Sequence, residues 1–190
     1  MKDAFFEDQL FNDLDFTAGV LDKGEYDHCE FKSCNFKETD LANYRFRECL
    51  FEDCDLSLVQ MVHTIFNNVE FVDCKLIGAK FHEVDPFLLS LSFRNSNLEF
   101  ASFYKLRLKN THFKMCNLRE ADFTQADLTA AVFHDCDLMA AVFENSVLYK
   151  ADFRTSTNYT IDPEINQLKK ARFSLDQLPG LLRKYDIEVD

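Results

Sequence analysis

Residues 121–140 read ADFTQADLTAAVFHDCDLMA, and in this stretch a Phe or Leu returns at every fifth position. A small residue, Ala or Cys, stands two positions before each large one, and the other three positions are mostly polar. A helix would show apolar spacings of three and four, and a half-buried strand a spacing of two. The period of five fits neither, so it indicates a short repeat that turns one large side chain inward every five residues.

The same lattice extends from this stretch over nearly the whole chain. Large apolar residues occupy every fifth position from Phe6 to Phe81, sixteen in all, and again from Phe93 to Phe153, thirteen more. The lattice holds 17 of the 21 Phe residues, and the two runs are offset by two residues. Such a strict short period predicts a solenoid, whose narrow interior leaves room for one large and one small residue per repeat.

The repeat has the form small–Asp/Asn–Leu/Phe–polar–polar, as in residues 121–125 and 126–130, and it resembles the pentapeptide-repeat family over residues 4–155. The resemblance implies an all-β fold, a right-handed quadrilateral parallel β-helix with four pentapeptides in each coil. Stacked coils would rise by about 4.8 Å, the spacing between strands, so seven to eight coils would form a rod of roughly 35–40 Å.

Two regions are expected to depart from the regular repeat. The first is a register break at residues 84–92 in the domain 1–155, where Pro86 cannot donate a ladder hydrogen bond. This segment contains Phe87 and three Leu residues, so we expect it to fold back onto the core. Both a simple register bulge and a corner that contacts a partner fit this sequence.

The second region, residues 156–190, is expected to hold the last coil, a short capping helix and a dimerisation tail. Asp162-Pro163-Glu164 has the pattern of a helix start, and Phe173 restores the lattice 20 residues after Phe153. Residues 176–185 are expected to form a short helix capped by Asp176, and Ile187 and Val189 a small strand. The apolar residues that could close the end of the rod or pair with a second copy are Leu178, Leu181, Leu182, Tyr185, Ile187 and Val189.

The seven Cys residues all occupy the small inward position, and Cys34, Cys54 and Cys74 stand 20 residues apart in one column. Buried free Cys behaves as a small hydrophobe, so structural filling is favoured over metal binding or redox chemistry. The spacings match no zinc pattern. The five His residues all index to outward positions, and we find no catalytic set or phosphate loop. We therefore expect no enzyme activity and no cofactor.

The net charge of −12 is concentrated in the amino-terminal half, because residues 1–85 carry 19 acids and 8 bases. Indexing by coils places an excess of carboxylates on one side of the rod, and this side is the candidate partner-binding surface. Its acids are Asp13, Glu30, Glu52, Asp53, Glu70, Asp73, Asp135 and Asp152, and its bases are Lys32, Arg94, Lys114 and Arg154. A solvated side that keeps a Phe-rich rod soluble remains the alternative interpretation of this stripe.

Several segments, such as residues 51–58, 70–78 and 158–175, resemble the topoisomerase-protecting branch of the family. This branch includes the albicidin-resistance protein, the microcin B immunity protein, the Qnr proteins and MfpA. The resemblance implies a tail-to-tail homodimer that mimics duplex DNA, binds DNA gyrase and protects it from a poison. It implies no direct binding of nucleic acid. The alternative is a scaffold rod with an unrelated protein partner.

Two features differ from that picture. The chain has no long projecting loop, and its acidity lies at the amino-terminal end, so a tail-to-tail dimer would be most negative at its tips. No apolar run of about 18 residues suggests a membrane span, and no signal-peptide pattern is found at the start of the chain, so we expect a cytoplasmic protein.

Overall fold

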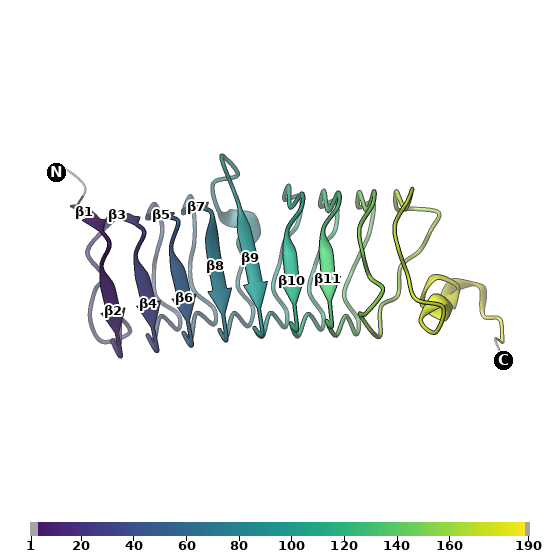
Figure 1. Cartoon of the computed structure of the whole chain (residues 1–190), viewed down its shortest axis with the longest axis horizontal. Helices are drawn as coiled ribbons and strands as arrows, with labels where there is room; N and C mark the ends of the chain where they lie inside the picture. Colours follow the sequence, from purple (N-terminus) through teal and green to yellow (C-terminus); the bar gives the residue numbers. More distant parts are fainter. Residues whose placement is uncertain (1–3, 189–190) are drawn as a thin grey trace.

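A computed structural model of the chain describes residues 4–188, and these form a rod of stacked coils with the two ends of the chain at opposite ends (Figure 1). One coil takes 20 residues, because Phe11 pairs with Phe31 and Phe31 with Phe51 in parallel register. Since a large side chain turns inward every five residues, each coil has four sides. The solenoid predicted from the five-residue period is confirmed, as is the all-β parallel architecture that the resemblance implied.

Two sides of the rod carry short strands. The strands are β1 (Ala4–Glu7), β2 (Leu10–Asn12), β3 (Gly24–Asp27), β4 (Glu30–Lys32), β5 (Arg45–Arg47), β6 (Leu50–Glu52), β7 (Ile65–Asn67), β8 (Val69–Val72), β9 (Leu91–Arg94), β10 (His112–Lys114) and β11 (Val132–His134). The order β1-β3-β5-β7 forms the four-strand side, and β2-β4-β6-β8-β9-β10-β11 forms the seven-strand side. Isolated bridges such as Asn35–Asp55 and Asp40–Gln60 join the coils on the third and fourth sides.

The core is one linear stack of large side chains. Phe31, Phe51, Phe103 and Phe123 are fully buried. Rings of successive coils stack face to face, with centroids 4.7 Å apart for Phe31–Phe51 and 5.0 Å for Phe103–Phe123. Rings from adjoining sides meet edge to face, as in Phe113–Phe123 at 5.8 Å. Each buried ring contributes about 1.5–3 kcal/mol, so stability is spread along the rod.

The corners of the coil are of two kinds, which differ in the hydrogen bond that the small inward residue makes. At many corners its backbone N–H donates to the carbonyl of the preceding large residue, as from Ala126 to Phe123 at 3.0 Å. After the strands the small residue is mostly Cys or Ser, and its side chain donates instead to the large residue of the coil before. The Cys136 thiol, for example, lies 3.4 Å from the Phe113 carbonyl oxygen. All seven cysteines are free, buried and placed at corners that follow a strand.

The two extra residues of the register break lie in a loop on the four-strand side. The backbone N–H of Asp85 donates to Thr64 O and that of Ser90 donates to Phe66 O. These two bonds keep the coil closed on either side of residues 86–89, which therefore bulge outward as a loop. From β8 to β9 the pairing is offset, with Val69 opposite Leu91. The loop rises above the rod between β8 and β9 (Figure 1). Leu89 packs partly against the core, whereas Phe87 and Leu88 are 68% and 60% exposed.

The carboxyl-terminal cap differs from the predicted helix. It consists of two 3-10 turns, η2 (Leu178–Leu181) and η3 (Arg183–Tyr185), and a third 3-10 turn, η1 (Phe81–Glu83), precedes the loop. Gln177, not Asp176, precedes η2, and no side chain caps it. Pro179 and Gly180 stand inside this segment and disfavour a continuous α-helix. Residues 163–165 form a turn and Ile187 belongs to no strand, so these two predictions were also wrong; Val189 lies outside residues 4–188.

Candidate protein-interaction surface

All eight acids of the candidate stripe lie on the seven-strand side. Glu30, Glu52 and Glu70 belong to β4, β6 and β8, and Asp152 is bridged to Val132 at the end of β11. The other four, Asp13, Asp53, Asp73 and Asp135, stand at the corner that follows a strand. Six of the eight come from the first four coils, so the stripe is densest at the amino-terminal end of the rod.

Basic residues of the same side neutralise part of the stripe. The Lys32 ammonium lies 2.9 Å from a Glu30 carboxylate oxygen and 3.4 Å from one of Glu52, so it links two successive coils. Glu30 is the main cause of the raised pKa of Lys32. Arg94 lies 3.8 Å from Glu70. These pairs are about half exposed, and such surface ion pairs contribute only about 0–1 kcal/mol each.

At the carboxyl-terminal end of the stripe, Asp152 and Asp135 are also paired. Arg154 donates to Asp152 at 2.7 Å and lowers the pKa of that carboxyl group. His134 lies 3.3 Å from Asp135. The predicted acids and bases are therefore interleaved on one side, and the stripe is weaker than the number of acids alone suggests.

Three corner aspartates, Asp13, Asp53 and Asp73, have neutral polar neighbours in the part of the chain that the structure describes. The Ser33 hydroxyl donates to Asp53 at 3.0 Å, the Asn95 amide donates to Asp73, and Asn12 donates to Asp13. These aspartates adopt left-handed backbone angles, with φ near 55°. A short polar side chain tolerates this conformation better than most. Because these neighbours carry no charge, the three aspartates are the least compensated acids of the stripe.

The predicted tail residues gather at one end of the rod, but they differ in exposure. Leu178, Tyr185 and Ile187 are 37%, 48% and 56% exposed, whereas Leu181 packs partly against the core and Leu182 is half-buried. Leu175, which sequence reasoning did not select, is 81% exposed. Val189 lies outside the described residues. The exposed members form an apolar patch at the end of the rod.

An ionic network around the buried Asp27, on the four-strand side, was missed by the sequence analysis. The Asp27 side chain is 4% exposed and accepts hydrogen bonds from Arg47, one coil away, and from His28 at 2.9 Å. The Arg47 and His28 hydrogen bonds lower the pKa of Asp27 and outweigh the cost of its burial. The opposite charges stand 20 residues apart in the sequence, so the coil length was the signal that could have revealed them.

A surface cleft of about 600 Å³ opens between the first two coils near Phe16, Leu41 and Tyr44. Among residues 4–188, no group of three or more His, Cys, Asp or Glu is placed to hold a metal ion. No helix in these residues is both long enough and apolar enough to span a bilayer.

Comparison with known proteins identifies the repeat. A model described as "Pentapeptide repeat region" matches residues 24–103, and one described as "Pentapeptide repeats (8 copies)" matches residues 116–154. No curated protein matches the chain by sequence. The fold defines a four-sided β-solenoid repeat protein. The chain belongs to the pentapeptide-repeat family.

Solved structures share this fold at low sequence identity. A trypsin-treated variant of QnrB1, a plasmid-mediated fluoroquinolone resistance protein, matches with a TM-score of 0.75 and 17% identity, covering 100% of this chain and 92% of its own. HetL of the cyanobacterium Nostoc sp. strain PCC 7120, involved in heterocyst differentiation regulation, matches with a TM-score of 0.62 and 17% identity, covering 92% of this chain and 88% of its own. At such identities the likeness shows the fold and not the function.

Proposed function

We propose that the protein binds DNA gyrase, a type II topoisomerase, at a surface that normally holds duplex DNA, and so protects the enzyme from a poison. The observation that carries the proposal is the line of carboxylates along one side of a straight rod. The similarity in fold to QnrB1, which is described as a fluoroquinolone resistance protein, also supports this proposal. The proposed role is non-catalytic, and neither family match is to an enzyme family.

The amino-terminal half of the seven-strand side is the proposed contact. Glu52, Asp53, Glu70 and Asp73 lie on two neighbouring coils, and all are on the surface of the rod. Duplex DNA carries one charge per about 1.7 Å of axis, whereas coils are spaced by about 4.8 Å. The rod therefore imitates the sign and the linear form of DNA at a lower charge density. Carboxylates at this spacing would steer the rod toward a basic DNA-binding groove.

The decisive test replaces these four residues together, as Glu52→Gln, Asp53→Asn, Glu70→Gln and Asp73→Asn. The amides keep the shape and the hydrogen-bond acceptors, so folding should be little affected. We expect loss of binding to purified gyrase, and loss of protection in a supercoiling assay that contains a fluoroquinolone. The matched control is Glu38, Glu99, Glu120 and Glu144 replaced by Gln, because these glutamates lie on the third and fourth sides.

Equal effects of the two sets would show that only the net charge matters. If neither set altered protection, the stripe would be solvated surface. The alternative function, a scaffold rod for another protein, is consistent with the fold shared with HetL. It would be favoured if the native protein failed to bind gyrase in the first place.

A further inference from the structure

The four-strand side has a charge pattern that reverses along the rod. Past β7 this side continues through the bridged residues Arg107, Asp127, Val147 and Gln167. Its first five coils carry six acids (Glu7, Asp8, Glu25, Asp27, Glu48 and Asp85) and two bases (Arg45 and Arg47). Its last four coils carry five bases (Arg107, Lys109, Lys150, Lys169 and Lys170) and one acid (Asp127). The formal charge is therefore −4 on one half and +4 on the other.

The residues whose charge is opposite to the rest of their half are also arranged symmetrically about the fifth coil. Counted from the amino-terminal end with His neutral, the successive coils of this side carry −2, −2, +1, 0, −1, +2, −1, +1 and +2. The only bases of the acidic half stand two coils before the fifth coil, and the only acid of the basic half stands two coils after it. If the rod is turned end for end about the fifth coil, opposite charges meet at the first, second and third coils.

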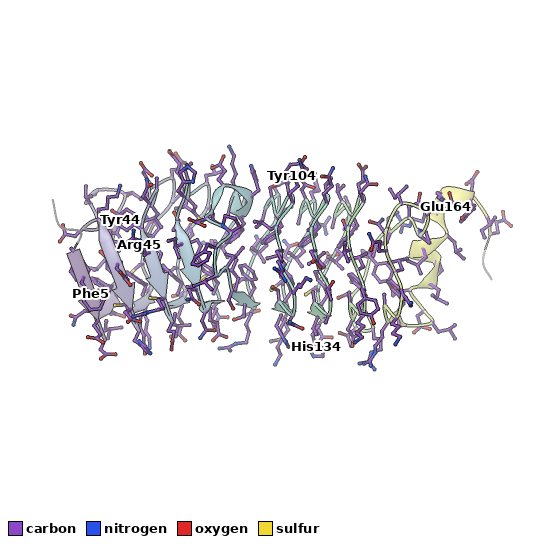
Figure 2. All side chains as sticks on the ribbon, turned by 90° about the horizontal axis from the view of Figure 1, so that it is seen from above. Phe5, Tyr44, Arg45, Tyr104, His134 and Glu164 are labelled. Carbon is purple, nitrogen blue, oxygen red and sulfur yellow. The ribbon has the colours of Figure 1, made fainter. Side chains whose placement is uncertain are left out.

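The fifth coil is the place where the loop 86–89 leaves the rod. Phe87 and Leu88 are exposed in this loop, and the outward residues of the coils next to it are Ile65, Asn67, Arg107 and Lys109. Figure 2 looks along the loop onto this side, with Phe5 and Arg45 on its acidic half. An exposed apolar centre between charged flanks is the usual anatomy of a protein interface, with an apolar core and a polar rim.

We propose that the four-strand side is a contact between two copies of this chain, packed antiparallel about a two-fold axis at the loop. Such an isologous contact requires a self-complementary surface, and the charge order supplies it for the three outer coils of each half. The fourth and sixth coils add no opposite pair, and the Asp85 residues of the two copies face each other at the axis. Lys169 and Lys170 of one copy face Glu7 and Asp8 of the other, and Lys150 faces Glu25. Asp127, which pairs with Lys109 at 3.1 Å in its own chain, faces Arg45 and the Arg47 that pairs with Asp27. Phe87 and Leu88 of the two copies meet at the axis.

A nucleic acid is the competing occupant of the basic half. A polyanion would bind only the last four coils and would meet the acidic coils of the same side, in a chain whose net charge is −12. It would leave the alternation within each half, and the apolar loop, without a role. The contact is also separate from the apolar patch at the tail, since the loop and the charges lie along the flank of the rod. Salt should weaken the contact on the flank and not the one at the tail.

Charge exchange between full-length variants tests the proposal. The base-reversed variant carries Lys150→Glu, Lys169→Glu and Lys170→Glu, and the acid-reversed variant carries Glu7→Lys, Asp8→Lys and Glu25→Lys. In sedimentation at low salt, we expect each variant alone to lose at least about tenfold in self-association relative to the native chain, because like charges then face each other. Mixing the two should restore association, since the acidic end coils of the base-reversed variant then face the basic end coils of the acid-reversed variant.

Fluorescence energy transfer between labelled copies separates this contact from any association of tails. Transfer in the mixed pair should exceed transfer within either variant, and the excess should vanish at high salt. The control reverses Glu38, Glu120 and Glu144 to Lys, on the third and fourth sides, and should leave native self-association unchanged. Phe87→Asp should weaken the native contact by roughly tenfold, because it places a charge at the centre of the interface.

The proposal is overturned if the mixed pair associates no better than either variant alone. It is equally overturned if the native chain shows no salt-sensitive association but shifts a DNA or RNA duplex in a gel, and base reversal abolishes that shift. That result would assign the basic half to a nucleic acid. Native circular dichroism spectra of both variants would establish that the reversals leave the fold intact.

Discussion

At the scale of single residues, the small inward position does more than fill space. The Cys54 thiol lies 3.3 Å from Phe31 O in the coil before and 3.3 Å from Glu52 O. Ser96 makes the corresponding contacts to Phe71 O and Arg94 O, and also accepts the Cys74 N–H at 3.1 Å. The side chains of Cys and Ser therefore donate hydrogen bonds to backbone carbonyl oxygens at the corners that follow a strand. At these corners the backbone N–H of the small residue mostly does not bond to the preceding large residue. Ala suffices where the backbone N–H reaches the large residue itself.

This role predicts the order of effects at Cys54. Cys54→Ser keeps a donor and should cost less than about 1 kcal/mol, whereas Cys54→Ala leaves Phe31 O without it and should cost about 1–3 kcal/mol. Chemical unfolding of the two variants measures the difference. Equal stabilities would mean that the thiol acts only as filler.

Alkylation tests the burial of the thiols. Burial raises the pKa of Cys49 to about 12, so its thiol should stay unreactive until the protein unfolds.

The large inward position should carry much more energy than the small one. Phe123 is fully buried and stacks between Phe103 and Phe143, with centroids 5.0 Å away on either side. Phe123→Ala should lower the free energy of unfolding by about 3–5 kcal/mol through lost contacts and a cavity. Thermal or denaturant unfolding measures it. A change smaller than about 1 kcal/mol would contradict the stacking shown here.

At the scale of elements, an ionic cluster fastens the cap to the last coil. The Lys184 ammonium lies 2.7 Å from Asp162 and 2.6 Å from Glu164, and the Tyr185 hydroxyl donates to Glu164 at 2.8 Å. Lys184 is the main cause of the lowered pKa values of both carboxyl groups. Carboxyl groups with lowered pKa values stabilise the folded state at pH above their ordinary values and lose this effect as the pH falls.

The cap should therefore loosen in acid. As the pH falls through the lowered pKa values of Asp162 and Glu164, protonation removes the attraction to Lys184, and the backbone amides of residues 178–185 should exchange faster than those of the coils. Hydrogen exchange at neutral and acidic pH, corrected for intrinsic rates, measures the effect. In Lys184→Met the cap should exchange fast at both pH values. A cap that is equally protected across this range would show that the cluster is solvated surface.

The apolar patch at the tail predicts association through the end of the rod. Leu175, Leu178 and Ile187 are exposed there, and pairing of two ends would remove them from water. We expect Leu178→Ser with Ile187→Ser to yield a smaller species in light scattering at high salt, where contacts between charged sides are screened. A species of unchanged mass would exclude the tail as a dimer contact. Deletion of residues 176–190 is a harsher version, because it also opens the end of the solenoid.

At the scale of the whole molecule, charge is distributed unevenly along the rod. Residues 1–85 carry a net charge of −11, and residues 86–155 carry 8 acids and 8 bases. Partner binding by the acidic half should therefore weaken steeply with salt, because exposed charges are screened over about 8–10 Å at physiological ionic strength. Titration of gyrase binding against salt measures the slope. Binding that is insensitive to salt would point to the apolar loop or the tail instead.

Much of the fold could be predicted because it is local. A large residue at every fifth position, from Phe6 to Phe81 and again from Phe93 to Phe153, predicts a solenoid, and the offset between Phe81 and Phe93 locates the loop. The eight acids of the stripe were assigned to one side with the coil of 20 residues that the family resemblance implied, since such a coil puts every twentieth residue in line. The chain determined this by itself because burial of Phe and Leu outweighs every other local preference.

Only the tertiary structure decided which charges are compensated and how the end is closed. The pairing of Lys32 with two coils, and of Arg47 with buried Asp27, depends on distances between side chains of different coils. The cap closes the end through Gly180, which packs so tightly on Tyr159 that a side chain at this position would clash with the backbone. Such features come from contacts between residues that are remote in the chain, and no local period encodes them.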